Sequence, residues 1–241
     1  MLLKEWGEKA TTLVEPWVIL GRDARVITIF SQIMSSQQIV APHSFSSVGE
    51  DVVASLTLLG IDSNDPVKIV INSPGGHVDA GFMIIQAMNH LKAKGIEVWT
   101  VDLCRTMSMG GIILMMGTKG RRYAMENTLI HTHFGKRSIS GESQADIDEA
   151  IKYTEAINQT IYRYMSENSN IPEFHIKRQG LDGYDPAKFK DLTERIKVIK
   201  NFLNNETLMS PEEAREAGII DKVLSPGDPI IDQIYSKQRS G

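Results

Sequence analysis

Short apolar runs alternate with amphipathic stretches along the first half of the chain. Residues 25–30 (RVITIF) and 67–72 (VKIVIN) are rich in β-branched residues and lead into turn-rich segments, so each run predicts a strand. Between them, valines and leucines over 52–59 recur at helical spacing and end at Gly60, which predicts a helix. A strand, a helix and a second strand in this order are typical of a parallel sheet.

The same alternation continues to about residue 133. Apolar residues over 80–91 form one helical stripe, and 97–102 (EVWTVD) predicts another strand. We expect a short apolar helix in SMGGIILMMG at 108–117 and a strand at 129–133 (LIHTH). The predicted fold class is therefore α/β, with parallel strands joined by helices that bury one face on the sheet.

The second half of the chain is more polar. Apolar residues from Ile147 to Met165 lie at helical intervals and predict a long amphipathic helix over 145–165. The segment 171–190 is rich in Pro and Gly and predicts irregular structure, and a charged helix is expected over 187–203. A capping box predicts a short helix over 211–217, and the last dozen residues are expected to form a tail.

Composition excludes several classes of protein. The 241 residues are 41% hydrophobic and 23% charged, as in globular proteins, and no apolar run is long enough to span a bilayer, so no membrane role is expected. The formal net charge of −4 gives no basic excess for nucleic acid. A single cysteine, Cys104, excludes an intrachain disulfide and a multi-thiolate metal site. With no signal peptide evident, we expect a cytoplasmic protein.

Two segments could supply a nucleophile and an anion site. The Pro-Gly-Gly of INSPGG at 71–76 follows a predicted strand, so its backbone N–H groups could face a ligand, and a plain strand-to-helix turn is the alternative. The segment is neither a P-loop nor a dinucleotide fingerprint, so no nucleotide cofactor is expected. Ser108 lies between a predicted strand and an apolar helix, where it is either a nucleophile or the N-cap of the helix.

His131 and His133 are two residues apart on a predicted strand, so their side chains share one face. Such a pair suits either two metal ligands or one general base beside a bystander. A zinc site needs a third ligand, and the single cysteine lies on what is expected to be a buried strand, so no metal is expected and a general base fits better. His77, directly after the glycine pair, is a further candidate, although an exposed loop histidine is the alternative.

An ordered set of motifs resembles the ClpP family of self-compartmentalising serine peptidases. The set consists of INSPGG, SMGG about thirty residues later, RRYAMEN at 121–127, a histidine on the following strand, and LMSPEEAREAGIIDKVL at 208–224. The resemblance covers roughly residues 25–165 and 204–224. It implies a ClpP/crotonase-like spiral of repeated ββα units with a protruding handle helix.

The resemblance also divides the chain into segments. It implies an N-terminal segment over 1–24, which is a possible axial region, and a single peptidase domain over 25–228. An insertion of about 170–203 falls inside this domain, and a C-terminal tail occupies 229–241.

Position by position, the resemblance implies that Ser108 is the nucleophile and His133 the base, and that the backbone N–H groups of Gly76 and Met109 form the oxyanion hole. The family has an aspartate four residues before the serine that caps the closing helix, and Glu206 stands at that place here. The implied activity is that of a serine endopeptidase, which hydrolyses peptide bonds in unfolded proteins or peptides by acyl-enzyme chemistry without a cofactor.

The resemblance further implies a homo-oligomer. In this family, seven-membered rings stack face to face through a long helix and enclose the active sites, and a separate AAA+ unfoldase feeds them substrate. The polar start of this chain and the glutamate at 206 depart from the family pattern. Two alternatives therefore stay open, namely a catalytically weak or inactive ring subunit and a crotonase-like acyl-CoA enzyme with paired backbone amides around a thioester oxyanion.

Overall fold

The computed structural model describes residues 13–15, 18–35, 48–133, 143–180, 191–204 and 207–236. Its strands are β1 (Leu13–Glu15), β2 (Val18–Gly21), β3 (Val26–Ile29), β4 (Val67–Ser73), β5 (Val98–Met107), β6 (Arg122–Met125), β7 (Leu129–Thr132), β8 (Thr207–Met209) and β9 (Lys222–Leu224). Its helices are α1 (Val48–Asp62), α2 (Val78–Ala93), α3 (Met109–Met115), α4 (Gln144–Asn168), α5 (Ile171–Arg178), α6 (Leu192–Asn204), α7 (Pro211–Glu216) and α8 (Pro229–Tyr235).

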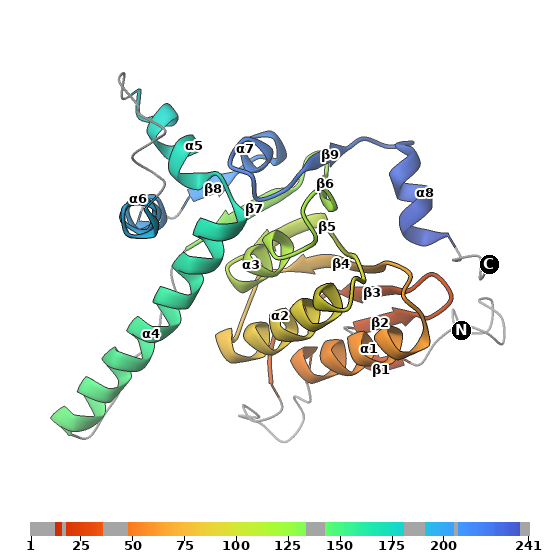
Figure 1. Cartoon of the computed structure of the whole chain (residues 1–241), viewed down its shortest axis with the longest axis horizontal. Coiled ribbons are helices and arrows are strands. Elements are labelled where there is room, and N and C mark those ends of the chain that lie inside the picture. Colours follow the sequence, from red (N-terminus) through yellow and green to blue (C-terminus); the bar gives the residue numbers. More distant parts are fainter. Residues whose placement is uncertain are drawn as a thin grey trace.

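The strands form one mixed sheet with a parallel centre. Its order is β1-β2-β3-β4-β5-β6-β9, with β7 paired to β5 and β8 paired to β7. The pairs β3-β4, β4-β5, β5-β6, β5-β7 and β6-β9 are parallel, and the pairs β1-β2, β2-β3 and β7-β8 are antiparallel. Helices α1 and α2 connect successive parallel strands (Figure 1), so the predicted α/β class is confirmed.

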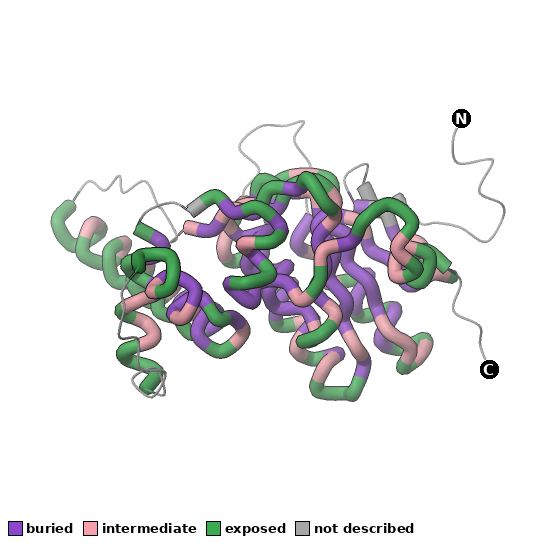
Figure 2. Tube along the Cα trace, turned by 90° about the horizontal axis from the view of Figure 1, so that it is seen from above, coloured by how far each residue is buried: buried purple, intermediate pink, exposed green. Residues whose placement is uncertain are grey.

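Two apolar layers cover opposite faces of the sheet. The larger layer lies between the sheet and α1, α2 and α3, and it includes Ile69 and Ile71 of β4. The smaller layer contains Val70 and Val101 on the other face, packed with Ile234 of α8. Strands that are buried on both faces, as β4 is, are typical of a parallel sheet. Figure 2 shows that the buried parts of the trace gather in the sheet and the helices against it.

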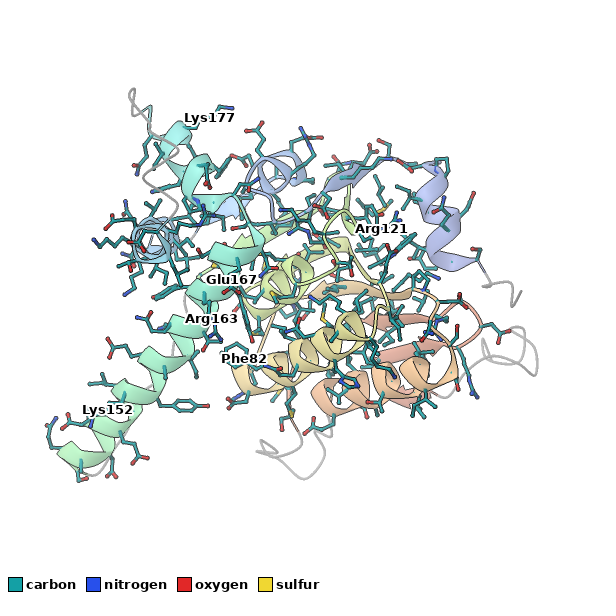
Figure 3. The ribbon with its side chains drawn as sticks, in the orientation of Figure 1. Phe82, Arg121, Lys152, Arg163, Glu167 and Lys177 are labelled. Atoms are coloured by element: carbon teal, nitrogen blue, oxygen red, sulfur yellow. The ribbon has the colours of Figure 1, made fainter. Side chains whose placement is uncertain are left out.

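Helix α4 extends away from this body and is covered only near its C-terminal end. Its buried residues begin at Ile161, and none of residues 144–160 is buried. Phe82 of α2 meets Tyr164 of α4 edge to face with ring centroids 6.0 Å apart, whereas Lys152 lies on the projecting part (Figure 3). The predicted long amphipathic helix over 145–165 is confirmed.

Helices α5 and α6 pack against the C-terminal end of α4. Phe202 of α6 is buried, and Arg195 of the same helix donates to the carbonyl oxygens of Ser166 and Ser169, each at 3.1 Å. Arg195 also pairs with Glu173 of α5, with the nitrogen and oxygen 2.7 Å apart. The guanidinium therefore supplies donors to carbonyl groups that the end of a helix leaves open.

Two helices lie where the sequence analysis predicted none. Helix α5 lies within 171–190, which was expected to be irregular, and α8 lies within the expected tail at 229–241. Both helices have a proline, Pro172 or Pro229, in their first turn. A proline there removes no intrahelical hydrogen bond, so it starts these helices instead of breaking them.

Other elements differ from prediction mainly in their ends. The strand expected at 97–102 continues to Met107, and the helix expected over 187–203 is described from Leu192 to Asn204. Cys104, expected on a buried strand, is exposed. Among the described helices, none combines the length and the apolar character needed to cross a membrane.

Candidate active site

Ser108 occupies a strained turn between β5 and α3. Its φ of 52° and ψ of −122° lie in a region that L-residues rarely adopt. Its N–H donates to the carbonyl of His131 at 2.8 Å, which ties the turn to β7. Ser108 stands at the N-cap position of α3, but its side chain makes no capping hydrogen bond. Of the two roles left open by the sequence, the geometry disfavours the cap and leaves the hydroxyl for chemistry.

The Pro-Gly-Gly segment forms a turn that packs directly on Ser108. A Cβ added to Gly75, whose φ is +90°, would come within 2.7 Å of the Ser108 Cβ and within 2.9 Å of the Met109 nitrogen. The buried Ser73 hydroxyl supports this turn, because it accepts from the Gly75 N–H at 3.1 Å and donates to the Ser31 carbonyl at 2.6 Å. Only glycine allows this close approach of two backbone segments.

Backbone N–H groups remain open at this junction. Ile33 pairs with the Gly75 carbonyl (2.8 Å) and the His77 N–H (2.7 Å), so the N–H of Gly76 faces away from Ile33. Met109 is the first residue of α3, and the first N–H groups of a helix have no intrahelical acceptor. Within the described ranges, no acceptor is found for the N–H of Gly76 or of Met109. The arrangement can therefore bind an anionic oxygen.

The two histidines lie at the end of β7, which is the neighbour of β5. Met107 is paired with His131 in the parallel register, so the histidines are beside the turn that holds Ser108. The rings of His131 and His133 are 5.4 Å apart, and both residues are half-buried. No group of three or more metal-ligating side chains occurs among the residues that the structure describes. His77 is exposed at the N-cap position of α2.

Glu206 lies outside the described residues, but the strand that follows it is described. Antiparallel β8 pairs with β7, and Thr207 stands opposite Thr132. Thr207 is the chain neighbour of Glu206, and Thr132 is the chain neighbour of His133. The segments that lead to the two predicted residues are therefore joined by one ladder of hydrogen bonds.

One ionisable group on the strand that leads to Ser108 was not singled out from the sequence. Asp102 of β5 is completely buried, and burial raises its pKa to about 7, with hydrogen-bonding groups on Thr128, Thr106 and Cys104 acting in the opposite direction. The signal in the sequence is an acidic residue inside the apolar run VWTVDLC. Charged residues are rarely buried without a partner, so the burial of Asp102 in the strand that leads to Ser108 is unusual.

Comparison with known proteins places the chain in a family. The sequence pattern of the Clp protease family matches residues 21–227. The chain is 30% identical to the ATP-dependent Clp protease proteolytic subunit of Deinococcus radiodurans over 217 residues, covering 88% of this chain and 92% of that protein. It is 28% identical to the ATP-dependent Clp protease proteolytic subunit 2 of Bacillus licheniformis over 213 residues, covering 87% and 98%. Since the match extends over most of its length, this chain belongs to the Clp protease family of serine peptidases.

Proposed function

We propose that this chain is a serine endopeptidase that hydrolyses peptide bonds in unfolded proteins or peptides, with Ser108 as nucleophile and His133 as general base. The conformation of Ser108 is the observation that supports this role most strongly. Its positive φ, its side chain without a capping hydrogen bond and the glycine turn packed on it are features of a nucleophile on a strained turn. We call residues 107–109 the nucleophile turn.

The chemistry is acyl transfer. His133 takes the proton of the Ser108 hydroxyl as the serine oxygen attacks the peptide carbonyl, and the N–H groups of Gly76 and Met109 stabilise the resulting oxyanion. The protonated histidine gives its proton to the leaving amine, which departs as the acyl-enzyme forms. Water, deprotonated by the same histidine, then attacks the ester, and the serine leaves with its proton restored.

Glu206 is our candidate for the third member of the triad. The pairing of Thr207 with Thr132 supports this assignment, because each of the two is next in the chain to a proposed triad residue. A carboxylate in this role accepts the second N–H of the histidine, holds its tautomer and stabilises the imidazolium. Glutamate supplies the same group as aspartate on a chain that is longer by one methylene.

The active serine can be tested with a fluorophosphonate probe, read by intact mass, on the wild type and on Ser108→Ala, Glu206→Gln and Ser143→Ala. We expect the wild type and Ser143→Ala to gain one adduct, because Ser143 only caps α4. Ser108→Ala should gain none, and Glu206→Gln should react about 10²–10⁴-fold more slowly. A folded wild type that is never labelled would refute the proposal and favour an inactive ring subunit.

A substrate assay separates peptidase from acyl-CoA chemistry. We expect a chemically unfolded, fluorescently labelled protein to be cut by the wild type and not by Ser108→Ala. Turnover of an acyl-CoA thioester that survives Ser108→Ala would instead favour the crotonase-like alternative, because thioester activation by backbone amides needs no serine nucleophile.

We further propose that subunits assemble into stacked seven-membered rings through α4, in the cytoplasm, and that an AAA+ unfoldase supplies substrate. Support comes from the projecting part of α4, where apolar side chains such as Ile151 (48% exposed) and Tyr153 (40% exposed) meet no core. Apolar faces of this kind are typical of subunit contacts. Native mass spectrometry should show that Ile151→Glu separates the rings, whereas the matched surface change Lys152→Glu leaves them stacked.

A further inference from the structure

Asp102 is a buried carboxyl in the strand that leads to the nucleophile turn. It is 0% exposed, and in the part of the chain that the structure describes neither of its carboxyl oxygens has a hydrogen bond of good geometry. Burial of a carboxyl without firm partners is unfavourable. An unsatisfied buried group of this kind therefore points to a role beyond packing.

The strand changes its neighbour immediately after Asp102. Asp102 is paired with Ala124 of β6, the last pair between these two strands. Three residues later, Arg105 is paired with Leu129 of β7. Asp102 therefore marks the point where β5 leaves β6 and joins the strand that leads to the histidines.

The pairing with β4 also changes at Asp102. Asp102 stands opposite Ile71, whereas Thr106 stands opposite Ser73, so β5 holds three residues (103–105) where β4 holds one. Extra residues in one strand form a bulge, and a bulge changes the direction of the chain that follows it. The chain that follows this bulge is Thr106 and then the nucleophile turn.

The face of β5 that carries Asp102 lies under α3. Thr100, two residues earlier and so on the same face, donates to the Leu114 carbonyl of α3 at 2.7 Å. Helix α3 has no charged residue, and the β4 and β7 residues on this face are uncharged. Arg122 of β6 is bound to Asp221 by two nitrogens, at 2.9 and 2.6 Å. Lys92 of α2 donates to the Met116 carbonyl at 2.8 Å, so both this lysine and Arg122 are held by partners other than Asp102.

Three weak donors surround the carboxyl. The hydroxyls of Thr128 and Thr106 and the N–H of Cys104 favour its charged form, but burial outweighs them and raises the pKa of Asp102 to about 7. The two threonine side chains are themselves buried and have no partner of good geometry. Loss of the proton turns the carboxyl into an acceptor only, so these donors must move toward it.

We propose that Asp102 is a positioning residue for Ser108: in its neutral form it maintains the bulge that aims the nucleophile turn, and its ionisation distorts that turn and lowers reactivity. This inference rests on the proposed role of Ser108 as nucleophile. Thr106 is the physical connection, because it faces the carboxyl and lies two residues before Ser108. The protonation state of Asp102 would thus control how the Ser108 hydroxyl is aligned.

The test measures the second-order rate constant for fluorophosphonate labelling from pH 5.5 to 9 in the wild type, in Asp102→Asn and in the control Asp232→Asn on α8. Asparagine has the shape of the neutral acid and cannot ionise. At pH 6 we expect equal rates. At pH 8, one unit above the Asp102 pKa, about one neutral molecule in eleven remains, so Asp102→Asn should react about tenfold faster than the wild type. The control should follow the wild type at every pH.

A second variant keeps the inference testable if Asp102→Asn folds poorly. Thr128→Val removes a donor that favours the charged form, so the alkaline fall in wild-type labelling should move to higher pH. The inference would be overturned if the ratio of the Asp102→Asn and wild-type labelling rates does not change with pH. It would also be overturned if the alkaline fall in labelling occurs at the same pH in Thr128→Val and the wild type. A wild type that is not labelled at any pH would instead refute the serine chemistry itself, so the two failures are distinct.

The pH dependence of unfolding gives a readout separate from activity. Because folding raises the pKa of Asp102, the wild type should lose stability relative to Asp102→Asn as pH rises from the ordinary carboxyl range to about 7. If the stability of the wild type changes with pH in this way but its labelling rate relative to Asp102→Asn does not, Asp102 has a structural role only and the positioning role is refuted.

Discussion

Removal of the Arg195 guanidinium should detach α6 and disturb the strand that follows it. Arg195 donates to the Ser166 hydroxyl and to the carbonyls of Ser166 and Ser169, all at 3.1 Å, and pairs with Glu173. Arg195→Met keeps the apolar stem of the side chain and removes all of these contacts. The change therefore isolates the charged group from the packing of the helix.

The magnitude follows from the burial of each contact. Arg195 is only 17% exposed, but Glu173 is 36% exposed, so solvent screens their ion pair and its loss costs about 0.5–1 kcal/mol. The two carbonyls lose donors in a partly buried setting, at about 1 kcal/mol each. We expect Arg195→Met to lower the free energy of unfolding by about 2–3 kcal/mol.

The effect should extend to β8. Only residues 205 and 206 separate the end of α6 from β8, and β8 pairs with the strand that leads to His133. Hydrogen exchange read by mass spectrometry should therefore show faster exchange in the peptide that contains Leu208, and fluorophosphonate labelling should slow.

The matched control for this prediction is Lys197→Met on the same helix. The ion pair of Lys197 with Glu194 is exposed at both ends and screened by solvent, so we expect Lys197→Met to unfold at the same urea concentration as the wild type. If Arg195→Met unfolds at the same urea concentration as Lys197→Met, or leaves exchange in β8 unchanged, the anchoring role of Arg195 is refuted.

Three further predictions address the site and the pH dependence of stability. Gly76→Ala would place a Cβ 2.1 Å from the Ile33 carbonyl oxygen at a φ of +151°, so fluorophosphonate labelling should slow by about 10²-fold or more. Gly120 also has a positive φ, but a Cβ added there would meet no atom, so Gly120→Ala should keep the wild-type labelling rate. Burial, reinforced by the nearby Arg178, lowers the pKa of His175. The melting temperature of the wild type should therefore fall relative to that of His175→Gln as pH drops below about 6.5. Melting temperatures that change equally with pH in the two proteins would contradict this. Burial lowers the pKa of Lys68 to about 8, which corresponds to about 3 kcal/mol of destabilisation at pH 7, whereas Lys68→Met also removes a hydrogen bond to the Ala24 carbonyl worth about 1 kcal/mol. We therefore expect urea titrations to show Lys68→Met more stable by about 2 kcal/mol at pH 7. This difference should shrink from pH 8 to 10 as the wild type loses its proton.

The sequence predicts those helices and strands whose apolar residues recur with a clear local period. The strand at 67–72 and the helix over 80–91 follow from periodicity, because their apolar residues face a core formed by their own neighbours. Strands β8 and β9 have three residues each, too few for a pattern, and pairing with distant strands defines them. Helix α5 was not predicted because Pro172 lies in a stretch rich in Pro and Gly, although proline is tolerated in the first turn of a helix.

The site shows the same division. The motifs around Ser108 and His133 predict which groups carry the chemistry, and pairing of β5 with β7 brings the ends of these two strands side by side. The positive φ of Ser108 depends on its bond to β7 and on the packing of Gly75, so no local pattern predicts it. The setting of Asp102 depends on a change of partner strand that only the folded chain reveals.

The projecting part of α4 behaves thermodynamically more like a peptide than like part of a domain. Residues 144–160 have no buried side chain, so their helix is held by its capping box at Ser143, by local propensity and by contacts such as that of Tyr153 with Asp79. Helices of this length are marginal in water and unwind gradually from the free end. A separated subunit should therefore lose ellipticity over a broad temperature range below its cooperative transition, and this sloping baseline should flatten when α4 is covered.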